Sequence, residues 1–103
     1  MEFIVIASRF MKQPERERIV IEAVIEAAEA IGANRIVKRR GNVYSTGVYI
    51  TDGEDKTMVY NDWNRNWDCK KIYKDIMASI PFSPVFQQNK SVNSEWEIVL
   101  WAK

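Results

Sequence analysis

The segment from Pro14 to Gly32 constrains the fold most, because it has the pattern and the boundaries of one amphipathic helix. Proline is favoured in the first turn of a helix, and glycine is common just past its end. Between them, apolar residues recur at three- and four-residue spacing, and glutamates occupy the other side. The apolar stripe is wide, so we predict a helix over residues 14–31 that packs deeply against the rest of the chain.

The segments on either side of this helix have the composition of strands. A short run rich in Ile and Val at residues 3–8 is typical of a central strand that is buried on both faces. Gly41-Asn42 predicts a two-residue hairpin turn, and Asp52-Gly53 predicts a second, longer turn. We therefore expect three antiparallel strands at residues 35–40, 43–51 and 56–61.

A second helix is predicted to begin near Asp68, whose carboxylate can cap free backbone N–H groups, and to stop at Pro81. A loop with at most one short edge strand follows, and the final "EWEIVLWA" is expected to be a strand. The expected order is β-α-β-β-β-α-(β)-β. We predict an α+β fold, in which a mainly antiparallel sheet of about five strands carries two helices packed on one face. The 103 residues are expected to form a single domain over 1–103.

The composition of the chain excludes several classes of function. It has no histidine and one cysteine, so we expect no internal disulfide, no zinc cluster and no hydrolase that relies on histidine. A net charge of +1 gives no overall attraction to nucleic acid or anionic lipid. No segment approaches the ~20 apolar residues that cross a bilayer. We therefore expect a cytoplasmic protein that is not an enzyme, has no catalytic residues, metal or cofactor, and has no membrane partner.

Three residues allow both a chemical and a structural interpretation. Cys69 at a helix N-terminus could be a reactive thiol of low pKa, but it shares an apolar stripe with Ile72 and Ile76. We expect it to be buried and unreactive. Asp62 and Asp68 could hold Mg²⁺ or transfer protons, but aspartate also ends strands and caps helices, and we expect the structural roles here.

The segment "YNDWNRNWDCKK", residues 60–71, gives the strongest indication of a binding surface. Its two tryptophans lie on a connection, where neither helix nor strand periodicity directs them inward. Tryptophan and arginine are enriched in interface hot spots. We expect one ring to fill the end of the core and choose Trp67, which leaves Trp63 beside Arg65 on the surface. The sequence therefore predicts a compact adaptor, or an inhibitor from a phage or other mobile element, that binds another protein through Trp63, Arg65 and Trp67.

The sheet offers an alternative surface for RNA or single-stranded DNA. With a hairpin at Gly41-Asn42, alternation places Val37, Val48, Ile50 and Val59 on the helix-covered face. Basic and aromatic side chains then share the open face, as in modules that stack bases and bind phosphates, although such residues are also common on ordinary solvated strands. The candidate nucleic-acid-binding residues are Lys38, Arg40, Tyr49, Lys56 and Tyr60 on the sheet, with Lys70, Lys71 and Lys74 on the second helix.

The central α-β-β-β-α order, with "KKIYK" at residues 70–74, resembles the double-stranded RNA-binding domain. The second helix of that family opens with a similar lysine cluster that straddles phosphates, so the resemblance implies this role for Lys70, Lys71 and Lys74. It covers about half of the chain. The chain lacks the family's histidine-containing loop and has two further strands. Protein binding therefore ranks first and nucleic-acid binding second.

Overall fold

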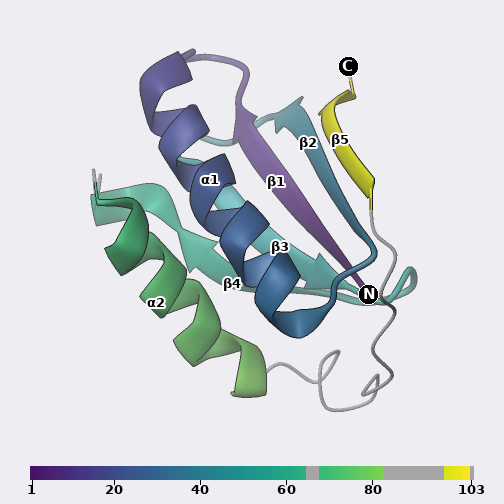
Figure 1. Cartoon of the computed structure of the whole chain (residues 1–103). Helices are drawn as coiled ribbons and strands as arrows, with labels where there is room; N and C mark the ends of the chain where they lie inside the picture. The colour runs from purple at the N-terminus through teal and green to yellow at the C-terminus, as the bar shows by residue number, and fades with distance from the viewer. Residues whose placement is uncertain (65–67, 83–96, 103) are drawn as a thin grey trace.

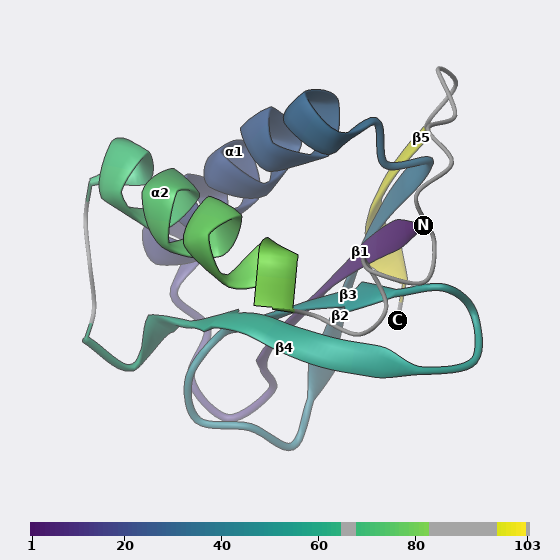
Figure 2. The same ribbon diagram turned by 90° about the horizontal axis from the view of Figure 1, so that it is seen from below.

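The computed structural model describes residues 1–64, 68–82 and 97–102. These form a five-stranded sheet with both helices on the same face (Figures 1 and 2). In chain order, the elements are β1 Glu2–Ser8, α1 Pro14–Ile31, β2 Arg35–Gly41, β3 Gly47–Thr51, β4 Lys56–Asn61, α2 Cys69–Ser79 and β5 Glu97–Ala102, with short 3-10 turns at Asp62–Asn64 and Ile80–Phe82. Neither of the two described helices has the length and apolar character that a bilayer span requires.

The sheet is mixed, with the strand order β4-β3-β1-β2-β5. The central strand β1 pairs parallel with β2 and antiparallel with β3; β2 pairs parallel with β5, and β3 pairs antiparallel with β4. The predicted α+β class is confirmed, but a mainly antiparallel sheet is not found. The reason is α1, because a helical crossover between two neighbouring strands makes them parallel. The optional edge strand that was predicted before β5 lies outside the described residues.

Three of the four helix boundaries follow from local signals. Pro14 opens α1, and Gly32 closes it in the left-handed conformation at φ 68°, where its N–H donates to the carbonyl of Ala28. Asp68 caps α2, since its Oδ1 accepts from the backbone N–H of Lys70 at 2.9 Å. These predictions are confirmed.

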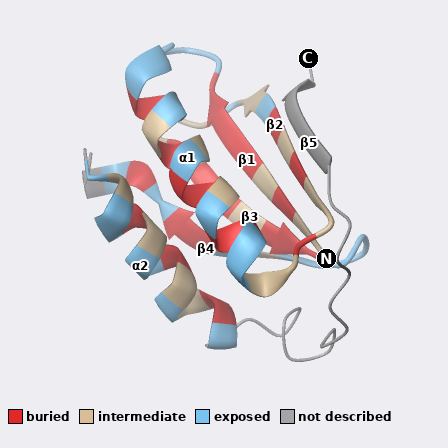
Figure 3. Cartoon of the chain, viewed as in Figure 1, coloured by how far each residue is buried: buried red, intermediate tan, exposed pale blue. Residues whose placement is uncertain are grey.

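The core lies between the sheet and the two helices (Figure 3). Burial of one large aliphatic or aromatic side chain stabilises the folded state by about 1.5–3 kcal/mol. The largest fully buried side chains include Phe3, Val5, Ile36, Val48 and Ile50 from the sheet and Val20, Val24, Ile72 and Ile76 from the helices. No described helix covers the opposite face of the sheet (Figure 2), which we call the uncovered face.

The predicted hairpin at Gly41-Asn42 is wrong. Strands β2 and β3 lie on opposite sides of β1, so residues 42–46 cross over the end of β1 instead of making a tight turn. The described glycines with positive φ are Gly32 and Gly53. Gly41 instead lets the backbone pack closely against the side chain of Ile6, because a Cβ at position 41 would lie 2.8 Å from Cγ2 of Ile6. The second turn is confirmed, with Gly53 at φ 105° between β3 and β4.

The parallel pairing also changes which residues of β2 face the helices. Phe3 lies opposite Ile36, and Val5 lies opposite Lys38, so Lys38 shares the helix-covered face with core residues. Arg40 follows on the same side, and Val37 lies on the uncovered face. The sequence interpretation had these three residues on the wrong faces, because it started from the hairpin.

A β-bulge in β4 corrects a further assignment. Val48 pairs with Tyr60 and Tyr49 pairs with Met58, so Val59 is an extra residue in the ladder. Val59 and Tyr60 are consequently both buried in the core cluster, although strict alternation predicted opposite faces for them. The expected burial of Val48, Ile50 and Val59 is confirmed.

Candidate functional site

Three connections meet at one edge of the sheet. Strands β1, β2, β4 and β5 run in the same direction and β3 runs opposite to them, so four strand ends and one strand start share this edge. The connections there are residues 9–13 before α1, residues 42–46 before β3, and the turn that begins at Asp62. Binding sites concentrate on such connections at the carboxyl ends of parallel strands, where a rigid sheet positions them.

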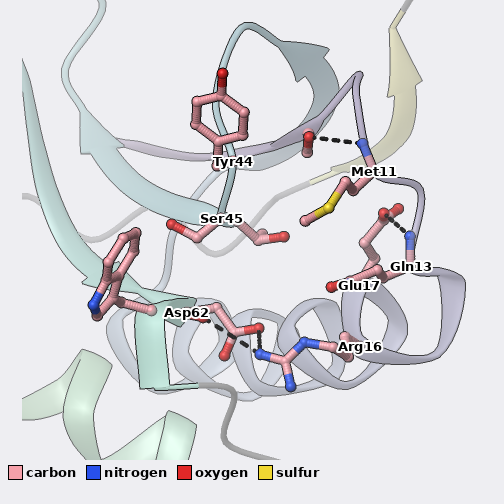
Figure 4. Close-up of a pocket in the computed structure, with 10 residues that line it drawn as sticks. Met11, Gln13, Arg16, Glu17, Tyr44, Ser45 and Asp62 are labelled. Atoms are coloured by element: carbon pink, nitrogen blue, oxygen red, sulfur yellow. Dashed lines mark hydrogen bonds and ion pairs between the residues drawn. The ribbon is translucent and has the colours of Figure 1, made fainter.

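A concavity of about 250 Å³ opens between these connections (Figure 4). Buried polar side chains form its floor, and exposed apolar side chains form its edge. The floor includes Ser8, Arg16, Glu17, Thr46 and Asp62. The exposed side chains at its edge are Met11, Tyr44 and Trp63.

Apolar exposure is concentrated at this edge of the molecule. The ring of Phe10 stacks on that of Tyr44, with centroids 5.5 Å apart and planes at 29°. Tyr44 is 73% exposed and Trp63 is 74% exposed. In the described part of the chain, four of the five exposed large apolar side chains therefore lie here, and we call them the apolar rim: Phe10, Met11, Tyr44 and Trp63.

The hydroxyl of Ser8 holds the loop that carries two rim residues. Its Oγ accepts from the backbone N–H groups of Phe10 and Met11, each at 3.1 Å. Ser8 is the last residue of β1 and is itself buried, so the loop is anchored directly to the central strand.

An ion pair between Arg16 of α1 and Asp62 forms one half of the floor. Both side chains are buried, and the hydroxyl of Tyr60 donates to the other oxygen of Asp62 at 2.9 Å. The backbone N–H of Asp62 donates to the carbonyl of Thr46 at 2.8 Å, which ties the end of β4 to the 42–46 connection. Burial and the adjacent carboxylate raise the pKa of Tyr60, so its hydroxyl remains a donor at neutral pH.

Glu17 forms the other half of the floor. Its carboxylate accepts from Nζ of Lys38 and from Nη2 of Arg40, each at 2.8 Å, and from the backbone N–H of Gln13 at 3.0 Å. Arg40 also donates to the carbonyl of Ser8 at 2.7 Å. Burial alone would raise the pKa of Glu17, but these hydrogen bonds from Arg40, Lys38 and Gln13 lower it to about 2.

The floor has the chemistry of a rigid support. General acids and bases work best with pKa values near the operating pH, whereas Glu17 and Tyr60 are shifted away from neutrality in opposite directions. Among the residues that the structure describes, no three Cys, Asp or Glu side chains are grouped so as to hold a metal ion.

One member of the predicted Trp-Arg-Trp surface lies at this site. Trp63 is exposed, as the sequence interpretation expected, and it forms part of the apolar rim. Arg65 and Trp67 lie outside the described residues.

The candidate nucleic-acid-binding residues lie in three separate places. Lys38 is 3% exposed and Tyr60 is 9% exposed, and both lie with Arg40 on the helix-covered side of the sheet. Tyr49 and Lys56 share the uncovered face, where Nζ of Lys56 lies 5.0 Å from the centroid of the Tyr49 ring. The exposed lysines of α2 are Lys70, Lys71 and Lys74. The eight residues do not form one surface.

Sequence reasoning missed most of the site. Tyr44 was assigned to a strand, and Phe10 and Met11 were not considered because they follow the first strand directly. Arg16 and Glu17 were not singled out in the sequence. A signal for their burial exists, because Arg16 lies four residues before Val20, on the apolar stripe of α1.

Comparison of the chain with protein-family models, with curated proteins and with solved structures gives no match. The resemblance to the double-stranded RNA-binding domain gains no support from these comparisons. Its three middle strands also do not form consecutive neighbours here, because β1 separates β2 from β3. A functional proposal therefore depends on the geometry of the sheet edge.

Proposed function

We propose that the chain is a small, non-enzymatic protein-binding module that acts as an adaptor or inhibitor through the apolar rim. The observation that carries this proposal is the gathering of exposed large apolar side chains at one concavity: Met11, Tyr44 and Trp63 line it, and Phe10 stacks on Tyr44. Contiguous exposed apolar patches mark interaction sites, and tryptophan and tyrosine dominate interface hot spots. A cytoplasmic location belongs to the proposal, because a single cysteine fits a reducing compartment.

The support beneath the rim favours tight binding. Ser8 fixes the loop of Phe10 and Met11, and the stacking of Phe10 on Tyr44 joins that loop to the 42–46 connection. The ion pair of Arg16 with Asp62 fixes the turn that carries Trp63. Side chains that are ordered before binding lose less conformational entropy when a partner arrives.

Arg65 and Trp67 remain part of the proposed surface. They follow Trp63 within four residues of the chain, and they are of the types that anchor interfaces.

Capture of partners from a host-cell lysate by the immobilised chain, followed by mass spectrometry, tests the proposal. A bound protein should be retained after nuclease treatment, and Trp63→Ala or Tyr44→Ala should weaken its binding by ≥ ~2 kcal/mol, or about 30-fold. Met58→Ala is the matched control, because Met58 is also an exposed apolar side chain but lies on the uncovered face. Equal capture by the wild type and both rim variants would overturn the proposal.

Binding of RNA or single-stranded DNA is the alternative function. The pairing of Tyr49 with Lys56 on the uncovered face supports it, because a base can stack where a cation lies beside an aromatic ring. Under this alternative, nuclease treatment abolishes capture. Tyr49→Ala then weakens oligonucleotide binding by about 1–3 kcal/mol, and Trp63→Ala has no effect.

A further inference from the structure

Two exposed cations are chain neighbours of the rim residues Phe10 and Met11. Arg9 and Lys12 lie directly before Phe10 and directly after Met11, and both are exposed. Within the described part of the chain, neither has an ion-pair partner. Arg18 differs from them, because it is paired with Glu15 at 3.1 Å and with Glu22 at 2.6 Å. Arg9 and Lys12 therefore remain available to a partner.

The floor of the concavity does not offset this positive charge. Its two carboxylates, Glu17 and Asp62, are already paired with cations. Neither carboxylate of the floor is therefore free to meet a cationic partner group, whereas an anionic group near Arg9 and Lys12 would be attracted.

The size of the concavity indicates what enters it. Its volume of about 250 Å³ is below the roughly 300–1,000 Å³ that is typical of small-molecule pockets. It suits one protruding side chain. The exposed side chains around it are apolar and aromatic, so an apolar or aromatic anchor is the best fit.

We infer that the partner's contact segment carries one large apolar anchor that enters the concavity, flanked by Asp or Glu residues that face Arg9 and Lys12. This inference rests on the proposed function and specifies the partner of the same rim. A polynucleotide fits less well, because its affinity grows with the number of phosphates that cations neutralise, and only two exposed cations flank the rim residues Phe10 and Met11.

A library of random dodecapeptides displayed on phage tests the inference with the intact chain. Selection on the wild type, followed by removal of clones that also bind the Trp63→Ala/Tyr44→Ala variant, isolates the peptides that need the rim. The expected clones contain a large apolar residue with Asp and Glu enriched on either side. Rim-dependent clones without enrichment of acidic residues would overturn the inference and leave the proposed function standing.

A charge-reversed variant provides the second arm. Arg9→Glu/Lys12→Glu should weaken binding of the leading acidic peptide about tenfold at low ionic strength, and less in high salt, where exposed charges are screened. Lys56→Glu/Lys74→Glu makes the same charge change at exposed positions, one at the end of β4 that is opposite to Trp63 and one in the middle of α2, and should leave binding unchanged. Equal effects of both reversals would show a general charge effect and overturn the inference.

Two outcomes would remove the proposed function itself. One is the absence of any rim-dependent clone in the selection. The other is binding of a fluorescent single-stranded oligonucleotide that is lost in the Trp63→Ala variant, since this would assign the rim to nucleic acid. These two outcomes differ from a third, in which rim-dependent clones are selected but carry no enrichment of acidic residues. That third outcome overturns only the inference, so failure of the inference and failure of the proposed function can be distinguished.

Discussion

The hydroxyl of Tyr60 donates to Oδ1 of Asp62 at 2.9 Å, and this bond connects the bulge in β4 to the floor of the concavity. The other oxygen of Asp62 pairs with Arg16, so the end of β4 is tied to the first turn of α1. The bulge makes this possible, because it turns Tyr60 toward the helices. A local irregularity of one strand thus positions the turn that presents Trp63.

Replacement of Tyr60 by phenylalanine tests this bond. The ring still fills the core, but a buried carboxylate loses a donor, so the free energy of unfolding should fall by about 1–3 kcal/mol. Urea denaturation measures the change. Tyr49→Phe removes a hydroxyl on the uncovered face and should change stability by no more than about 0.5 kcal/mol. Equal losses in the two variants would contradict the importance of the Tyr60–Asp62 bond.

The carboxylate of Glu17 should make stability depend on pH. Glu17→Gln leaves Lys38 and Arg40 with an uncharged partner, which should lower the free energy of unfolding by about 3–5 kcal/mol at pH 7. The pKa of Glu17 is lowered from 4.5 to about 2 in the folded state. Its contribution is therefore fully present above pH 4.5 and is lost as the pH falls toward 2.

The difference between wild type and Glu17→Gln should accordingly shrink between pH 4.5 and about 2. Urea denaturation at several pH values measures this difference. Glu29→Gln on the exposed side of α1 is the control, and its small effect should not vary in this way. A Glu17→Gln difference that stays constant over the interval would show that the ion pairs do not lower the pKa of Glu17.

The elements that the sequence predicts correctly are those with local signals. Pro14, Gly32 and Asp68 mark helix ends through their own backbone and side-chain chemistry, and each does so in the structure. The turn at Gly53 is likewise local, because it needs a positive φ. Such features require no knowledge of what lies elsewhere in the fold.

The pairing of the strands depends on distant parts of the chain. Gly41-Asn42 has the composition of a hairpin turn, which would pair β2 with β3. In the structure, β2 instead pairs with β1, to which α1 connects it, and β3 pairs with the other side of β1. This one change moves Lys38 and Arg40 to the helix-covered face and turns residues 42–46 into a crossing that presents Tyr44. Trp63 was within reach of sequence reasoning, whereas the rest of the rim depends on this topology.

Cys69 should react slowly with thiol reagents in the native protein. It is half-buried at the start of α2, and burial together with the carboxylates of Glu26 and Glu22 raises its pKa. Less thiolate is then present at a given pH. A pH–rate profile should give an apparent pKa above that of the unfolded chain. Glu26→Gln should lower this apparent pKa of Cys69, and Glu29→Gln should not. Equal reaction rates of the thiol in native and unfolded protein would contradict the prediction.

Gly41→Ala should destabilise the fold through a clash and not through backbone strain. Its added Cβ would lie 2.8 Å from Cγ2 of Ile6, and such overpacking typically costs about 1–3 kcal/mol. Ile6→Ala removes the clashing atom at the cost of a cavity. In the double variant, the fall in the free energy of unfolding should therefore be smaller than the sum of the falls in the two single variants, by at least about 0.5 kcal/mol. Urea denaturation measures all three values. Strict additivity would show that Gly41 is required for another reason, and that its contact with Ile6 does not hold the crossing connection against β1.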